Sequence, residues 1–389
     1  MKKTGIVFLI IIMLSPLLSA DTLSLSFVHN ATDNLFQSSL AEADQVSGLT
    51  FSLDKDISGF SLFTSGTYSH IYENSQITYY NQDLGLDYLF SLGDTTALYF
   101  SVLGSGTFYR SEYSDFNYTA FSVFSVLKSY LSQTSILKGN YSFVYRNYKA
   151  SLFDYWSHAL LVSLDKYFET KTTIKAEVNW GYKYFIHPNQ EQVYSFEEGM
   201  PQFSRGKGKG KQTGPGMLPP ADSIRTGGEG IQIFSVSSLL AQGLGSKIGL
   251  NFNIMRQWVL SGKNPFATVQ EFYMVENPSY DRFSWAGYEM GSQFTLLIPW
   301  MVELKTGYSY SEKRFPGIES LNLDEEPLGI MRKDRRGQVD VILKKNFARI
   351  SVFLSYAYIV NRSNDPYFDW SGHFFSVGFN WSHSLGGGQ

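Results

Sequence analysis

The sequence predicts an all-β protein: a closed antiparallel transmembrane β-barrel of about sixteen strands, within a range of about 14–18. Three observations indicate this fold. The chain opens with a short apolar leader, apolar and polar residues then alternate over many segments, and short connections between these segments alternate with long ones. The composition agrees, because 16% of the 389 residues are aromatic and only 17% are charged. Such a chain is unlike a disordered protein.

The composition also excludes several kinds of site. The chain has no cysteine, which excludes disulfides, cysteine-ligated zinc, iron–sulfur clusters and thiol catalysis. Its formal net charge is −3, so no overall positive field attracts nucleic acid. We therefore expect no nucleic-acid partner, no metal and no cofactor.

The first twenty residues have the layout of a secretory signal peptide. Lys2 and Lys3 precede an apolar run from Ile6 to Leu14, and small residues lead to Ala20. The run is too short to span a bilayer comfortably, and no second apolar run of helical length follows. We expect cleavage after Ala20, export of the chain, and a single barrel domain over residues 21–389.

Strict alternation of apolar and polar residues is typical of a β-strand with one apolar face. In residues 172–186, for example, Ile174, Val178 and Trp180 fall on one face, with Lys175 and Glu177 on the other. In chain order the predicted strands are 21–29, 45–54, 59–70, 79–91, 96–110, 118–131, 135–147, 157–166, 171–186, 230–242, 247–259, 282–297, 301–313, 335–344, 348–360 and 370–382. Most exceed the length usual in soluble proteins and suit tilted membrane strands. A large secreted sandwich would also alternate, but with shorter strands.

The connections between these strands alternate in length. After even-numbered strands they are short, such as 54–58 and 92–95, whereas after odd-numbered strands they are longer, such as 30–44 and 314–334. This is the layout of an outer-membrane barrel, with short turns on the periplasmic side and long loops outside. An even number of strands then puts both termini in the periplasm.

Charged residues on the polar faces are the first candidates for function, because sixteen strands enclose a water-filled lumen. The predicted pore-lining residues are Asp83, Asp87, Lys175, Glu177, Lys183, Glu289, Glu303, Lys305, Arg336, Asp340 and Lys344. Acids and bases are nearly balanced in this set, which indicates no clear ion preference. A structural alternative is that these charges pair across strands and stiffen the wall.

The longest connection, 187–229, is a Gly/Pro/Lys-rich loop that we expect outside the cell. Its cations Arg205, Lys207, Lys209 and Lys211 alternate with glycine and are candidates for contact with lipopolysaccharide phosphates or an anionic glycan. The alternatives are a flexible solvated loop, or a plug folded into the lumen.

Histidines and hydroxyl residues give weaker indications. Four histidines fall on the apolar, outward face near the long-loop ends of their strands: His29, His70, His158 and His373. A ring with an apolar body and a polar tip suits the headgroup region there, and we favour this interpretation over a metal site. No nucleophile-elbow, zinc-protease or phosphate-loop motif is present. We therefore expect that the protein is not an enzyme.

The last part of the chain resembles known outer-membrane barrels. Residues 374–381 resemble the C-terminal strand that the barrel assembly machinery recognises, although here the chain continues past Trp381. With Arg335 and Arg336 opening a strand and the segment 361–367 in the last loop, this region resembles the barrel domains of exopolysaccharide exporters and surface-lipoprotein assembly modifiers. The resemblance implies a Gram-negative outer-membrane β-barrel protein, with the assembly machinery as a partner.

These features together predict a porin-like channel, or an export conduit, for small polar solutes or a glycan in the bacterial outer membrane. Its other expected partners are outer-membrane lipid and lipopolysaccharide, and the sequence does not indicate an oligomeric state. One alternative is a surface-exposed barrel with a closed pore, whose loops bind a partner or lipopolysaccharide. A second alternative is an outer-membrane hydrolase.

Overall fold

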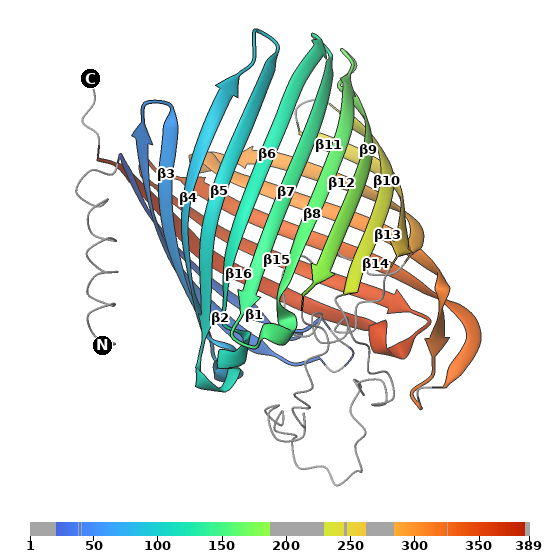
Figure 1. Ribbon diagram of the computed structural model, residues 1–389. Coiled ribbons are helices and arrows are strands. Elements are labelled where there is room, and N and C mark those ends of the chain that lie inside the picture. The colour runs from blue at the N-terminus through green and yellow to red at the C-terminus, as the bar shows by residue number, and fades with distance from the viewer. Residues whose placement is uncertain are drawn as a thin grey trace.

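The protein is a closed barrel of sixteen antiparallel strands (Figure 1), as the sequence predicts. The computed structural model describes residues 21–37, 39, 41–186, 229–244, 247–261, 284–324 and 326–385. The strands are β1 Thr22–Thr32, β2 Asp44–Ile57, β3 Phe60–Ile71, β4 Tyr79–Ser91, β5 Thr96–Tyr109, β6 Tyr118–Ser132, β7 Ser135–Tyr148, β8 Tyr155–Tyr167, β9 Thr172–Phe185, β10 Glu229–Leu244, β11 Ile248–Ser261, β12 Trp285–Ile298, β13 Val302–Leu321, β14 Pro327–Asn346, β15 Ile350–Ser363 and β16 Trp370–Ser384. Each pairs with its sequence neighbours, and β1 closes the ring against β16. Among the described residues, no helix is long and apolar enough to cross a membrane.

The closing pair involves the whole of β1. Thr22 lies opposite Ser384 at one end of the ladder, and Thr32 lies opposite Phe374 at the other, with no shift of register between them. The same residues of β1 pair on their other side with β2, from Asp54 to Asp44. Within the ring of described strands, the sheet is therefore closed on itself, which is the condition for a sheet to exist inside lipid.

The two ends of the barrel differ, as the alternating connection lengths predict. At the short-turn end, Ser58 and Gly59 form the two-residue turn between β2 and β3, with φ of 47° and 94°. Positive φ at both positions matches the right-handed twist of a hairpin, and glycine adopts it without strain. At the other end, short 3₁₀ segments such as Ser111–Phe116 and Ser151–Phe153 lie within the loops.

Both ends of the described chain lie at the short-turn end. The backbone N–H of Asp21 donates to the carbonyl of Asp54, and that of Leu385 donates to the carbonyl of Asp21, each at 2.8 Å. Lys55 Nζ lies 2.9 Å from Asp21 Oδ1. This hydrogen bond, together with one from the backbone N–H of Asp56, holds the pKa of Asp21 below its ordinary value.

One predicted loop is wrong. Residues 314–334 were expected to form a connection, but β13 and β14 each run for 20 residues through most of this segment. The pairing continues past Arg314 and Lys333 with two shifts of register, at Glu319 and at Leu321. The result is a two-stranded ribbon that extends beyond the neighbouring strands β12 and β15 (Figure 1). The length and polar character of the segment indicate a loop, but irregular two-stranded pairing accepts polar residues and tolerates Pro316 and Pro327 better than a central strand does.

The two faces of the wall differ in character. Val162, Val178 and Val236 lie side by side on β8, β9 and β10, with Val162 42% exposed and Val178 44% exposed. Large exposed apolar side chains recur on this face around the barrel, which is anomalous for a protein in water and expected for one in lipid. The neighbouring residue Asn179 lies opposite Ser235 on the other face. We call the apolar face the outer wall and the polar face the inner wall.

Buried carboxylates hold the connections at the long-loop end. Asp44 accepts hydrogen bonds from the backbone N–H groups of Gln45, Glu73 and Asn74, at 2.6, 3.0 and 3.0 Å. Asp154 accepts one from the backbone N–H of Tyr148 at 2.6 Å. Each carboxylate therefore ties the β3–β4 or β7–β8 connection to the end of a strand through charge-assisted hydrogen bonds.

The assignment of faces predicts unequal sensitivity at adjacent positions. Val178→Lys places a charge on the outer wall near mid-bilayer and should lower the free energy of unfolding by about 2–4 kcal/mol. Asn179→Lys, on the inner wall, should be tolerated. Urea titration of the barrel in lipid vesicles measures both, and equal losses at the two positions would contradict the assignment, because adjacent residues of a strand face opposite sides.

Candidate functional site

The inner wall is the candidate functional surface. All the charged residues predicted for it lie on the polar face, as their registers show: Asp83 opposite Ser65 and Ser105, Asp87 opposite Ser61 and Ser101, Lys175 opposite Asp165, Glu177 opposite Ser163 and Ser237, Lys183 opposite Ser157, Glu289 opposite Asn253 and Ser311, Glu303 opposite Lys344, Lys305 opposite Thr295, Arg336 opposite Ser311 and Asn361, and Asp340 opposite Gly307. Arg205, Lys207, Lys209 and Lys211 lie outside the described residues. Whether the inner-wall charges contact a solute stays a prediction.

Near the short-turn end, the inner-wall charges form ion pairs. Lys138 Nζ lies 2.5 Å from Asp165 Oδ2, between β7 and β8. Lys305 Nζ lies 2.9 Å from Glu303 Oε1, and Lys175 contacts Glu177 in the same way within β9. These contacts between opposite charges, within and between strands, agree with the alternative that the charges stiffen the wall.

The acids nearer the middle of the wall lie among small and amide side chains. Asp83 accepts hydrogen bonds from Asn81 Nδ2 at 2.9 Å and from Ser65 Oγ at 3.4 Å. The Asp340 carboxylate lies over Gly307 on β13, where an added Cβ would come within 2.3 Å of Oδ2. These carboxylates keep hydrogen-bonding capacity for water or a solute, because an ionised carboxylate accepts several bonds.

Near the long-loop end, cations of the inner wall lie over aromatic rings. Lys183 Nζ is 3.7 Å from the ring centre of Tyr155. Three further examples are the Arg146 guanidinium at 4.2 Å from Tyr118, Lys313 Nζ at 4.5 Å from Trp285, and the Arg336 guanidinium at 5.7 Å from Trp370. Cation–π contacts of this kind hold long side chains against the wall. They also put cationic groups and ring faces side by side on the inner wall at the long-loop end.

Sequence reasoning missed several charged residues of this wall. Lys128, Lys138, Arg146, Asp165 and Lys313 share the inward parity of the predicted set. The same rule of alternation would have found them. For the four residues on β6–β8, the alternation is harder to recognise because the inner wall there also carries apolar residues, among them Phe124, Val144 and Leu161.

His29, His70, His158 and His373 lie on the outer wall, as predicted. His158 Nδ1 is 2.7 Å from Tyr141 Oη, and His373 Nδ1 is 2.8 Å from Tyr356 Oη. His29 Nδ1 is 2.9 Å from Ser47 Oγ. Within the described ranges, no three potential metal ligands gather into a group. These rings therefore act with tyrosines as polar tips on an apolar surface, which is typical of an interfacial band.

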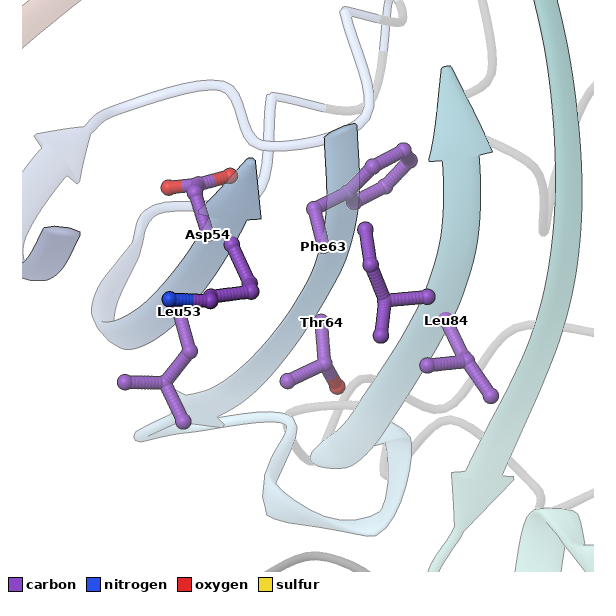
Figure 2. A pocket seen from close by; sticks show the side chains of 7 residues that line it. Leu53, Asp54, Phe63, Thr64 and Leu84 are labelled. Atoms are coloured by element: carbon purple, nitrogen blue, oxygen red, sulfur yellow. The ribbon is translucent and has the colours of Figure 1, made fainter. Parts of the chain in front are cut away.

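A small pocket between β2, β3 and β4 has a different character (Figure 2). Leu53, Leu62 and Leu84, which line it, share the parity of the outer wall. Figure 2 shows Thr64 of β3 between Leu53 of β2 and Leu84 of β4. Asp54 and Lys55 also line the pocket, but its leucines belong to the outer wall, which suits contact with lipid chains rather than with a polar solute, so the inner wall remains the candidate site.

Comparison with known proteins identifies the fold. No family model and no curated protein matches the sequence. The chain is similar to the crystal structures of OccK3 (OpdO) from Pseudomonas aeruginosa and OccAB1 from Acinetobacter baumannii, each at a TM-score of 0.50 and 10% identity over 94% of this chain and 96% of that chain. A bacterial polysaccharide outer membrane secretin aligns at a TM-score of 0.49 and 8% identity, over 94% of this chain and 99% of its own. The protein therefore has the fold of a sixteen-strand outer-membrane barrel.

The ion pairs of the inner wall should differ in their contribution to stability. The Asp165 side chain is only 4% exposed, whereas that of Glu303 is 31% exposed. Asp165→Asn should lower the free energy of unfolding by about 1–3 kcal/mol, because it weakens a charge-assisted bond in a shielded site. Glu303→Gln should cost less than about 1 kcal/mol, because water screens that pair. Urea titration compares the two variants, and an equal or larger loss for Glu303→Gln would contradict this account.

Proposed function

We propose that the protein is a porin-like channel of the bacterial outer membrane that passes small polar solutes or an exported glycan. The observation that carries this proposal is the two-faced wall. Sixteen closed strands enclose a lumen too wide for side chains to fill, so charged and small polar residues on its face are hydrated. The similarity in fold to OccK3 and OccAB1 supports the same conclusion.

The charges of the inner wall favour weak ion selectivity. Lys138 with Asp165 and Lys305 with Glu303 largely neutralise one another near the short-turn end. The cations at the other end, such as Lys183 and Arg336, lie beside aromatic rings. Cations next to ring faces suit solutes that combine a negative or strongly polar group with an apolar face, and sugar rings have such faces. Both the small-solute and the glycan form of the proposal are consistent with this arrangement.

Conductance tests the proposal against a barrel with a closed pore. The refolded protein in a planar bilayer should give stepwise, steady currents. A barrel that inserts but gives no current at any voltage would instead favour the alternative in which the pore is closed and the loops bind a partner. Insertion is checked separately by protection of the strands from protease in vesicles.

Adjacent arginines provide a matched test of which charges face the pore. Arg336 lies on the inner wall and Arg335 on the outer wall, because they are neighbours in β14. Arg336→Gln should shift the reversal potential in a salt gradient toward cation selectivity, since it removes a positive charge from the lumen. Arg335→Gln removes the same charge outside and should leave the reversal potential unchanged. Equal shifts for both variants would contradict the role of the inner wall.

A further inference from the structure

The outer wall carries a group of cations at the long-loop end of β13 and β14. Arg314 Nη2 and Lys333 Nζ lie 2.8 and 2.9 Å from Glu312 Oε1, and Arg335 Nε lies 3.3 Å from Glu312 Oε2. We call Glu312, Arg314, Lys333 and Arg335 the outer basic cluster. One carboxylate faces three cations, so the cluster has a net charge of +2.

The cluster continues the lipid-facing side of its strands. Glu312 and Arg314 share the parity of Tyr308, which is 50% exposed, and Arg335 shares the parity of Val339, which is 44% exposed. The Glu312 side chain is only 6% exposed, whereas those of Arg314 and Arg335 are 69% and 56% exposed. The carboxylate is therefore covered by the cations, whereas the two arginine side chains stay exposed.

The height of the cluster corresponds to the outer headgroup region. Arg314 lies twelve residues beyond Val302, the first residue of β13 at the short-turn end. A tilted strand advances about 2.4 Å per residue along the membrane normal, so Arg314 lies roughly 29 Å from that end, whereas the apolar band is about 25 Å tall. Tyr288 and Tyr310, whose ring centres are 6.1 Å apart, lie next to the cluster as an interfacial aromatic pair would.

Register adds a second, independent observation. Arg314 lies directly opposite Lys333 between β13 and β14, and Arg335 lies directly opposite Arg362 between β14 and β15. Like charges in direct cross-strand positions destabilise a sheet. Glu312 offsets the first pair, and Asp369 lies 2.9 Å from Arg362 Nη1. After these offsets the outer basic cluster keeps its net charge of +2, so an anion bound between the exposed guanidinium groups would be stabilised.

We propose that the outer basic cluster binds the phosphate groups of a phosphorylated lipid in the outer leaflet, of the lipopolysaccharide type. Guanidinium groups bind phosphate oxygens in a bidentate manner, and two arginines with a lysine match a doubly charged headgroup. A lipid is the favoured source of phosphate because the cluster stands where the apolar outer wall ends, so the acyl chains of the same molecule can cover that wall. This inference rests on the membrane location in the proposed function, but it does not require an open pore.

The test uses a variant that keeps the fold. Arg314→Gln/Arg335→Gln removes the net charge and leaves the pair of Lys333 with Glu312 in place. Diphosphorylated lipid A in detergent micelles should bind the wild-type barrel, and the double variant should bind it at least about tenfold more weakly, the cost of two charge-assisted contacts. Arg314→Lys/Arg335→Lys keeps the charge and should restore most of the binding. As the matched control, Arg110→Gln/Lys149→Gln removes two cations from other connections at the same end and should bind as the wild type does.

Further experiments distinguish a lipid from free phosphate as the ligand, and distinguish failure of this inference from failure of the proposed channel. Lipid A stripped of phosphate should bind poorly, and inorganic phosphate at equal concentration should not compete. Equal binding by the double variant, equal binding of the stripped lipid, or full competition by inorganic phosphate would overturn the inference. Self-association of the wild-type barrel through this face, without lipid, would also overturn it. Conductance is measured on the same preparations, so a barrel that conducts without binding the lipid contradicts only this inference, and one that binds without conducting contradicts only the channel.

Discussion

The structure depends on one constraint, that the backbone of a lipid-exposed strand must find all its hydrogen bonds within the protein. The ladder between β1 and β16 meets it, with Thr22 opposite Ser384 and Thr32 opposite Phe374. Once the ring is closed, no strand can slip by one residue without moving every side chain to the opposite face. Closure therefore fixes which residues meet lipid and which line the lumen, and the chemistry of both surfaces follows from it.

Closure also explains why so much of the fold could be predicted from sequence. Each membrane strand must be apolar on one side and polar on the other, so alternation such as that around Val178 and Asn179 identifies it without reference to its partner. The strand number and the two ends followed from this alternation and from the connection lengths. The ribbon of β13 and β14 was missed because it continues past the apolar part of the wall, where pairing no longer requires an apolar face, so a long polar segment indicated a loop.

The candidate site was predictable in direction but not in detail. Parity alone indicated that Lys175 and Glu177 face inward. It did not indicate that Lys138 meets Asp165, because that contact joins residues on two strands and depends on the register. The cations over aromatic rings, such as Lys183 over Tyr155, were hidden for the same reason. Inner walls also tolerate apolar residues, so the alternation that identifies a strand weakens where the wall carries aromatic groups.

The dipeptide Arg335-Arg336 shows how a strand can serve two surfaces at once. The pleat turns Arg336 toward Trp370 in the lumen and Arg335 toward Glu312 on the outer wall. A charge on the outer wall is costly at mid-bilayer but inexpensive at the headgroup level, and Arg335 lies at that level. On the outer wall, the distance of a residue from mid-bilayer therefore decides whether its position must be apolar or can carry a cation. On β13 and β14 the outer wall thus carries apolar side chains such as Tyr308 and Val339 up to the outer basic cluster, and this cluster is the part of it that we propose binds a headgroup.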